Sequence, residues 1–221
     1  GMLDAGKNEE DDIPAALRNV TEWPSSEKLT HEKELLGFYI SGHPLDPLTG
    51  ILDSYTLHKT NELKELESRT VTRIGGLVAE VKRGISRKTD KPYASATLED
   101  MQGTCTILLI NDNYEKFNDL LQVNQPLMVI GEVNNGEDVP KIFPQEILPL
   151  EDAPRKFTKQ VHLRLRVEKI SDNSLESVRA LTQAHPGKVP LLLCLRQPSG
   201  ASVFVEANER FNVTPSTSLQ A

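Results

Sequence analysis

The chain has 221 residues, of which 38% are hydrophobic and 26% charged, and its formal net charge is −7. This length predicts one or two domains, and the modest hydrophobic content predicts exposed segments beside the packed cores. The charge is uneven: residues 1–66 hold 6 basic and 13 acidic side chains, whereas residues 151–221 hold 10 basic and 7 acidic ones. The acidic balance argues against unspecific coating of DNA, but it leaves room for a local basic contact.

The two cysteines, Cys105 and Cys194, lie far apart in apolar runs, so they form neither a disulfide framework nor a metal-ligand spacing. We expect both to be buried free thiols in a reducing compartment. No apolar run approaches the length that spans a bilayer, and the acidic start does not resemble a signal peptide. The sequence therefore predicts a soluble, cytoplasmic protein with no membrane segment.

The first part of the chain predicts a tether followed by a helical lead-in. Residues 1–24 are polar and acidic without a sustained period, which is typical of a mobile tether. We expect Trp23 to pack back on the following helix rather than to bind a ligand. Residues 25–66 predict the helical lead-in, and its first helix is expected to end at residues 41–44, where Gly can cap it and Pro cannot continue it.

Residues 67–150 carry five strand-like runs, with one helical run between the third and the fourth. The expected strands cover residues 70–81, 92–99, 104–110, 126–133 and 139–147, and the expected helix covers residues 113–122. The OB-fold has this order of elements, and it binds nucleic acids across its second and third strands and its first and last hairpin loops. The sequence therefore predicts an OB-fold barrel with a nucleic-acid-binding role.

The loop at residues 82–91 concentrates positive charge in an otherwise acidic region. Five cations stand in it beside a single acid: Lys82, Arg83, Arg87, Lys88 and Lys91. Such a run can follow a phosphate backbone, with an affinity that falls as salt rises. Tyr93 is the best candidate for base stacking, and we expect Arg73 to share its face. The competing interpretation is a solvated hairpin whose charges only keep the chain soluble.

Residues 151–160, rich in Pro and basic side chains, predict a linker to a small α/β domain at residues 161–221. Alternation over 161–167 predicts a half-buried strand, and a helix and two further strands complete a β-α-β-β unit. Arg164 and Arg166 fall on the outer face of the first strand. They are candidates for contact with DNA or with a protein partner, or they form a plain polar face.

No catalytic or metal-binding cluster stands out. Metal-assisted nucleotide transfer needs clustered carboxylates, and the chain has no Asp-x-Asp pair. The five histidines are scattered without ligand spacing, and there is no Gly-rich phosphate loop. We therefore expect no catalytic residues, no metal ligands and no cofactor within this chain.

Two segments resemble a known family in the same order along the chain. Residues 32–45 (EKELLGFYISGHPL) and residues 78–82 with 91–100 (VAEVK and KPYASATLED), closed by Gly103, are similar to the C-terminal region of bacterial DNA polymerase III alpha subunits. The resemblance continues through His185-Pro186-Gly187 into the family's tau-binding domain. It departs at Ser95, where the family often has a larger side chain, and the family's internal clamp-binding peptide is absent.

The resemblance implies a non-catalytic fragment of a DNA-directed DNA polymerase whose complete chain would use Mg. Its implied partners are single-stranded template DNA, the clamp-loader tau subunit and the remainder of the polymerase chain. The alternative is a scaffold of the replisome, in which the barrel is a spacer without significant DNA binding. The expected fold is mixed: a helical lead-in, a five-stranded OB-fold β-barrel and a small β-α-β-β domain.

Overall fold

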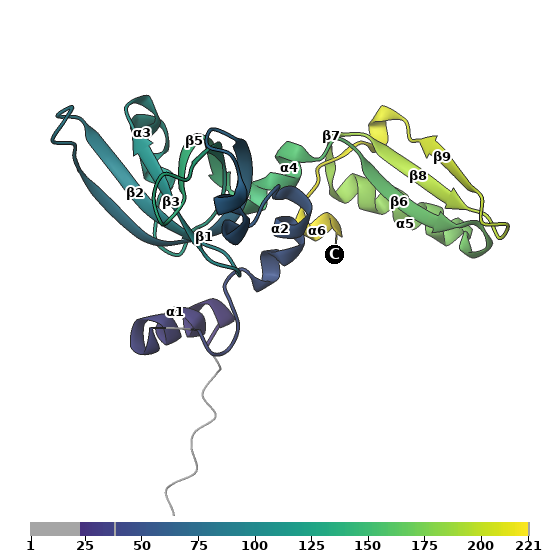
Figure 1. Cartoon of the computed structure of the whole chain (residues 1–221). Helices are drawn as coiled ribbons and strands as arrows, with labels where there is room; N and C mark the ends of the chain where they lie inside the picture. The colour runs from purple at the N-terminus through teal and green to yellow at the C-terminus, as the bar shows by residue number, and fades with distance from the viewer. Residues whose placement is uncertain (1–22, 38, 221) are drawn as a thin grey trace, which may run out of the picture. The chain divides into compact units, whose positions relative to one another are not determined.

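The computed structural model describes residues 23–37 and 39–220 (Figure 1). The chain divides into two compact units, Gly1–His43 and Pro44–Ala221. The tether expected over residues 1–24 lies almost entirely outside the described residues. The helical turns after Pro44 belong to the same compact unit as the barrel, and the predicted boundary at residue 66 stays a prediction.

The first helix, α1 (Ser25–Leu36), ends earlier than predicted. Gly37 follows it in the left-handed conformation, with φ of 81°, and its amide donates to the Lys33 carbonyl at 3.0 Å. The carboxylate of Glu32 stabilises the turn that follows by accepting hydrogen bonds from the Ser41 hydroxyl and from the Ser41 and Ile40 amides. These hydrogen bonds lower the pKa of Glu32. The ring of Trp23 lies 4.6 Å from that of His31, so it packs on this helix as predicted.

The predicted barrel is confirmed. Its strands are β1 (Val71–Ile85), β2 (Pro92–Glu99), β3 (Thr104–Ile110), β4 (Pro126–Asn134) and β5 (Lys141–Pro149). They close in the order β1-β2-β3-β5-β4, antiparallel except for β3 and β5. The predicted helix lies between β3 and β4 as α3 (Asp112–Phe117) and a 3-10 turn, η3 (Asn118–Leu120). This connectivity is that of the OB-fold.

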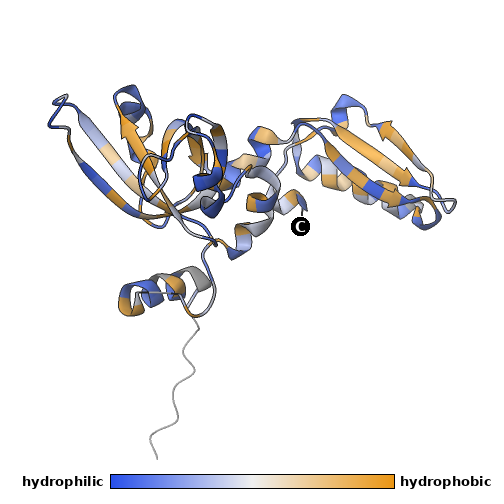
Figure 2. Cartoon of the chain, viewed as in Figure 1, coloured by the Kyte–Doolittle hydropathy of each residue, from blue (hydrophilic) through white to orange (hydrophobic). Residues whose placement is uncertain are grey.

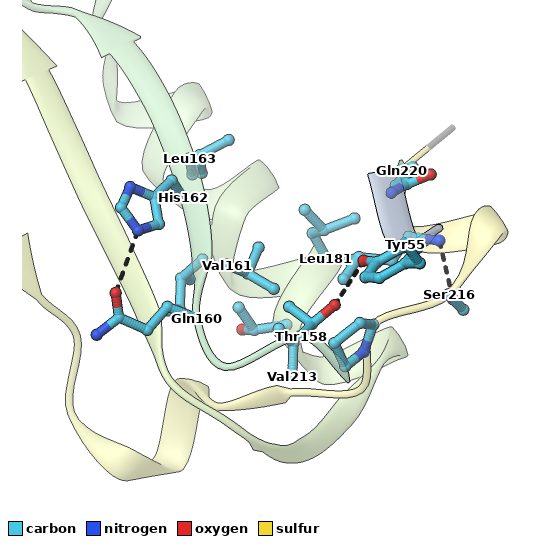
Figure 3. A pocket seen from close by; sticks show the side chains of 14 residues that line it. Tyr55, Thr158, Gln160, Val161, His162, Leu163, Leu181, Val213, Ser216 and Gln220 are labelled. Carbon is cyan, nitrogen blue, oxygen red and sulfur yellow. Dashed lines mark hydrogen bonds between the residues drawn. The ribbon is translucent and has the colours of Figure 1, made fainter. Parts of the chain in front are cut away.

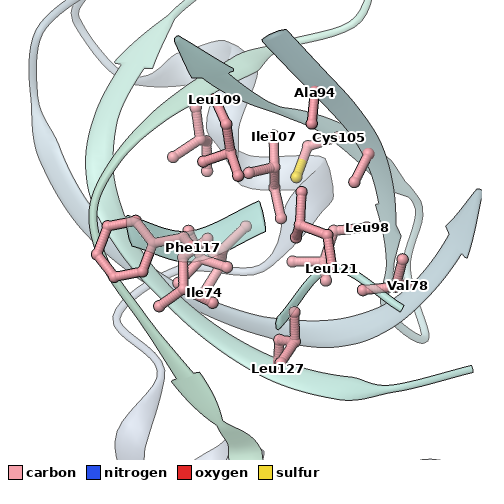
Figure 4. Close-up of a cluster of buried hydrophobic side chains, with 14 of the residues drawn as sticks. Ile74, Val78, Ala94, Leu98, Cys105, Ile107, Leu109, Phe117, Leu121 and Leu127 are labelled. Carbon is pink, nitrogen blue, oxygen red and sulfur yellow. The ribbon is translucent and has the colours of Figure 1, made fainter. Parts of the chain in front are cut away.

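The core of the barrel is built from the inward-facing residues of its strands, and the alternation is most regular on β2. On β2, Ala94, Ala96 and Leu98 are buried, while the residues between them face outward. Apolar side chains from all five strands meet inside, and α3 closes one end with Phe117 (Figure 4). On β1, Gly76 permits the close pairing with β2, since a Cβ there would lie 2.6 Å from the Glu99 carbonyl oxygen.

Short helical elements pack on the barrel before and after it. They are η1 (Asp46–Leu48), α2 (Thr49–Tyr55), η2 (Thr60–Glu65), η4 (Leu150–Asp152) and α4 (Ala153–Phe157). The last two cover most of residues 151–160, the segment predicted to be a linker. Pro154 suits the first turn of a helix, where no amide donor is required. It is buried with Ala153 where α4 contacts α2.

The C-terminal β-α-β-β unit is also confirmed. Strands β6 (Val161–Arg166), β8 (Leu191–Arg196) and β9 (Ser202–Glu206) form a sheet in that order, with β6 and β8 parallel. Helix α5 (Asp172–Ala184) connects β6 to the short β7 (Pro186–Val189) and runs along one side of the sheet (Figure 1). Beyond β9 lie η6 (Glu209–Phe211) and α6 (Thr217–Gln220). Both cysteines are buried free thiols, as predicted.

Within residues 23–37 and 39–220, no helix has the length and apolar character needed to span a membrane.

Candidate nucleic-acid interface

The outer side of β1, β2 and β3 is an open surface, which we call the barrel face. Two rows of paired residues cross it: Gly84, Tyr93 and Ile110 in the first, and Lys82, Ser95 and Leu108 in the second. Residues paired across neighbouring strands point to the same side of a sheet, so these side chains form one surface. It combines a tyrosine ring, a cation and small or apolar neighbours.

Tyr93 lies flat at the hairpin end of the barrel face. A Cβ built on Gly84 would lie 3.0–3.2 Å from ring and hydroxyl atoms of Tyr93, so the side chain of Tyr93 lies close over this glycine. The side chain is half-buried by this contact, and Ile110, 40% exposed, flanks it on β3. A planar ring supported from beneath and open above is the arrangement that base stacking requires.

The hairpin loop itself is shorter than predicted. Strand β1 continues to Ile85, so Lys82 and Arg83 are strand residues, paired with Ser95 and Ala94. The loop closes through two backbone hydrogen bonds between residues 86 and 90–91, at 2.8 and 2.9 Å. The sequence missed the continuation because a run of cations with one glycine is also typical of a loop.

Three of the five predicted cations remain in the loop. Arg87, Lys88 and Lys91 are exposed, and within the described part of the chain none of their side chains makes a hydrogen bond or an ion pair. Lys82 is also exposed, but its ammonium group lies 3.0 Å from the Glu80 carboxylate. The barrel face therefore carries one paired cation, and the hairpin beside it carries three unpaired ones.

Arg83, the fifth predicted cation, is also exposed, but its guanidinium has hydrogen-bond partners within the chain. Its Nε donates to the side-chain oxygen of Asn118 at 2.7 Å, and its Nη2 donates to the carbonyls of Asn118 and Leu121 at 3.2 and 2.9 Å. Carbonyls at the end of a helical segment lack partners within it. The guanidinium therefore fastens the end of η3 to β1 and has a structural role.

Arg73 is also placed differently from the prediction. At its position β1 pairs with β4, opposite Ile130, and the guanidinium lies 4.1 Å from the centre of the Phe157 ring. Its Nε donates to the Tyr55 carbonyl, and burial lowers the pKa of Arg73. Arg73 thus joins α2 and α4 to the barrel and does not share the face of Tyr93.

In the described part of the chain, the best acidic candidate for a metal ligand already has hydrogen-bond partners. Asp100, the best acidic candidate, accepts hydrogen bonds from the amides of Gln102 and Gly103 and from the amide and hydroxyl of Thr60, at 2.5–2.9 Å. Its carboxylate therefore anchors the β2–β3 turn and η2. In the described ranges, no three His, Cys, Asp or Glu side chains group closely enough to hold an ion.

A hollow of about 370 Å³ lies beside β6 and α5, lined by residues such as Val161, Leu181 and Val213 (Figure 3). The Tyr55 hydroxyl, on its rim, is 2.6 Å from the Thr158 hydroxyl. His162 also contributes to the lining, which includes no acidic side chain. A histidine–carboxylate pair is therefore not part of this lining.

Arg164 and Arg166 lie on the side of the C-terminal sheet away from this hollow. Both are exposed, and they contribute to a second hollow of about 690 Å³ together with Arg196 and Phe204. Arg196 and Phe204 were not singled out in the sequence. The sequence contained a usable signal, because pairing of the three expected strands brings the outward positions of neighbouring strands together.

A closed barrel of this connectivity, with an open face on its second and third strands, defines the chain as an OB-fold protein. No family model matches the sequence. Curated relatives do: the DNA polymerase III alpha subunit of Saccharopolyspora erythraea is 28% identical over 220 residues, covering 96% of this chain and 18% of the relative. That of Thermus aquaticus is 31% identical over 182 residues, covering 80% and 14%.

The chain is thus related to the C-terminal region of bacterial DNA polymerase III alpha subunits, and it spans less than a fifth of the length of these relatives. Among solved structures, the yeast mitochondrial single-stranded DNA binding protein Rim1 matches with 12% identity and a TM-score of 0.31, covering 38% of this chain and 96% of that one. A small single-stranded DNA-binding protein from Streptomyces coelicolor matches with 13% identity and the same TM-score, covering 38% and 95%. Values this low carry no inference about function.

Proposed function

We propose that the barrel binds single-stranded DNA, holding the template strand beside a replicative polymerase. The observation that carries this proposal is the open ring of Tyr93 on the barrel face, next to three hairpin cations with no ion-pair partner in the described residues. Phosphates displace counterions from such cations, and unpaired bases stack on exposed rings. The relatives' role in DNA replication supports a cytoplasmic location. We assign any Mg-dependent chemistry to parts of a longer chain.

The test is fluorescence anisotropy of a labelled oligo-dT with the full chain. Reversing three hairpin charges together, in the variant Arg87→Glu, Lys88→Glu and Lys91→Glu, is expected to weaken binding at least tenfold. The slope of log K against log salt should fall by about 2, since each single-strand phosphate contact contributes about 0.7. A matched control reverses three exposed cations elsewhere, Lys64, Lys159 and Lys169, and should change affinity less than threefold.

Tyr93 gives an independent test of the same site. Tyr93→Ala is expected to cost about 1–3 kcal/mol of binding free energy, as the loss of a stacked base does, whereas Tyr93→Phe should retain the affinity. If both the charge reversal and Tyr93→Ala bind as the control does, the barrel is a spacer. The scaffold interpretation would then stand in place of DNA binding.

We also propose that residues 161–221 dock the clamp-loader tau subunit. Val203 and Val205 support a protein partner, because they pair with Leu195 and Leu193 on the side of the sheet that carries α5, yet they remain 44% and 43% exposed. Uncovered apolar area of this kind is typical of interaction sites.

Pull-down with tau tests this assignment. Val203→Ser with Val205→Ser should reduce capture, while Ile85→Ser, which alters a 68% exposed apolar residue on the barrel hairpin, should not. If the Val203/Val205 variant captures tau as well as the unaltered chain does, these two residues are not part of the tau interface.

A further inference from the structure

The side of the C-terminal sheet opposite α5 is a basic, aromatic surface, which we call the arginine face. Three rows of paired residues cross it: His162, Leu192 and Glu206; Arg164, Cys194 and Phe204; and Arg166, Arg196 and Ser202. Hydropathy alternates along β6, with blue bands between orange ones (Figure 2). The apolar positions of β6 face α5, so the polar ones are left on this side.

Nothing in the described part of the chain neutralises the three arginines. None of Arg164, Arg166 and Arg196 makes a side-chain hydrogen bond or ion pair within residues 23–37 and 39–220, and all three are exposed. The one acid in the three rows, Glu206, stands in the row of His162, at the opposite end from Arg166 and Arg196. The face therefore presents an uncompensated positive charge around a hollow of about 690 Å³.

An aromatic ring stands within this charge. Phe204 on the edge strand β9 is 60% exposed, and its ring centre lies 6.4 Å from that of His162 in an edge-on arrangement. At this exposure the ring is accessible to a planar partner from solvent. Its row also holds Arg164, with Cys194 between them.

We propose that the arginine face is a second binding site for single-stranded DNA, separate from the barrel face. The arginines hold phosphates, and Phe204 stacks on an unpaired base. Duplex DNA hides its base faces within the stack, so an exposed ring among guanidiniums favours an unpaired strand. An acidic peptide would satisfy the charges but would leave the ring without a planar partner. The apolar side with Val203 and Val205 stays available to a protein at the same time.

The first experiment uses the full chain and a labelled oligo-dT of about 30 nucleotides. Arg164→Glu, Arg166→Glu and Arg196→Glu together are expected to weaken binding at least tenfold and to lower the salt slope by about 2. The control that reverses Lys64, Lys159 and Lys169 carries the same change of charge. Binding that equals the control's would overturn the proposal.

Combining this variant with the hairpin reversal at Arg87, Lys88 and Lys91 separates the two sites. If the arginine face binds DNA by itself, its reversal lowers affinity further in the hairpin-reversed background. Failure of the barrel proposal would instead show as no effect of the hairpin reversal, with the arginine-face effect intact. An arginine-face variant that binds DNA normally but loses capture of tau would make this surface a protein site and end the proposal.

Photo-crosslinking tests the proposal on the unaltered chain, so its result does not depend on whether a variant folds. An oligonucleotide carrying 5-iododeoxyuridine should crosslink to Phe204, which is the sole aromatic residue of the tryptic peptide 197–210 (QPSGASVFVEANER). Mass spectrometry identifies the peptide. Crosslinks confined to other peptides would contradict the assignment, and Phe204→Tyr should preserve the crosslink while Phe204→Ala abolishes it.

Discussion

The barrel and the C-terminal sheet use the same alternation of apolar and polar residues but bury the apolar ones to different degrees. In the barrel, Leu98 and Ile107 are fully buried, whereas in the sheet Val203 and Val205 keep over two-fifths of their surface exposed. Closure gives every barrel strand two neighbours and a shared interior. The three-stranded sheet has two edges and a single covering helix. A closed barrel is thus complete by itself, while the open sheet retains surface for partners.

The largest expected effect tests this difference in burial. Ile107→Ala should cost about 3 kcal/mol of barrel stability, because it removes buried methyl groups and leaves a cavity. Val205→Ala should cost less than about 1 kcal/mol, since much of its side chain is already in water. Hydrogen exchange resolved by peptide measures both regions separately. Equal losses would show that the sheet is as well packed as the barrel.

The next largest expected effect is the difference in stability between replacing an arginine of the barrel and replacing one of the C-terminal sheet. Arg83→Ala should destabilise the barrel by about 1–2 kcal/mol, because it removes the donor to the Leu121 carbonyl and to the side-chain oxygen of Asn118. The folded variant should still bind oligo-dT within threefold of the unaltered chain. Arg196→Ala, in contrast, should leave thermal stability unchanged. A large loss of DNA binding by folded Arg83→Ala would return Arg83 to the interface.

The barrel thiol makes stability depend on pH. Burial, with a smaller contribution from the Asp100 charge, raises the pKa of Cys105 from 9.0 to about 12. Above pH 9 the unfolded chain therefore releases a proton that the folded chain keeps, so stability falls as the pH rises toward 12. At pH 10 the loss is about 1.4 kcal/mol. Urea unfolding between pH 8 and 10 should show this slope in Cys194→Ala but not in Cys105→Ala.

The smallest effect concerns the ion pair on the barrel face. Glu80→Gln should change stability by less than about 0.5 kcal/mol, because the pair with Lys82 is exposed. It frees Lys82 for phosphate, so oligo-dT binding should strengthen about twofold at low salt and less at high salt. Anisotropy titrations at two salt concentrations measure the change. Weaker binding would place the DNA away from this part of the face.

The local pattern of apolar, polar and turn residues was sufficient to predict the order of the helices and strands along the chain. Strand-like runs bounded by turn residues marked the five barrel strands and the three main strands of the C-terminal sheet, and period-two alternation was clear at residues 161–167. Alternation also placed Arg164 and Arg166 on the outer face of the sheet. It did not find the end of α1, where Gly37 competed with a later Gly-His-Pro signal that is equally typical of a helix end.

The sequence by itself determined the two β units, the cationic hairpin and the charge that remains on the C-terminal sheet, since each depends on residues that are neighbours in the chain. Only the tertiary structure decided which cations are free. The partners of Arg83 lie 35 and 38 residues away and are mainly backbone carbonyls, while that of Arg73 is the carbonyl of Tyr55. Every residue has a backbone carbonyl, so the residue types in the sequence cannot show which carbonyl an arginine will bind. Folding alone brings these acceptors to the guanidinium groups.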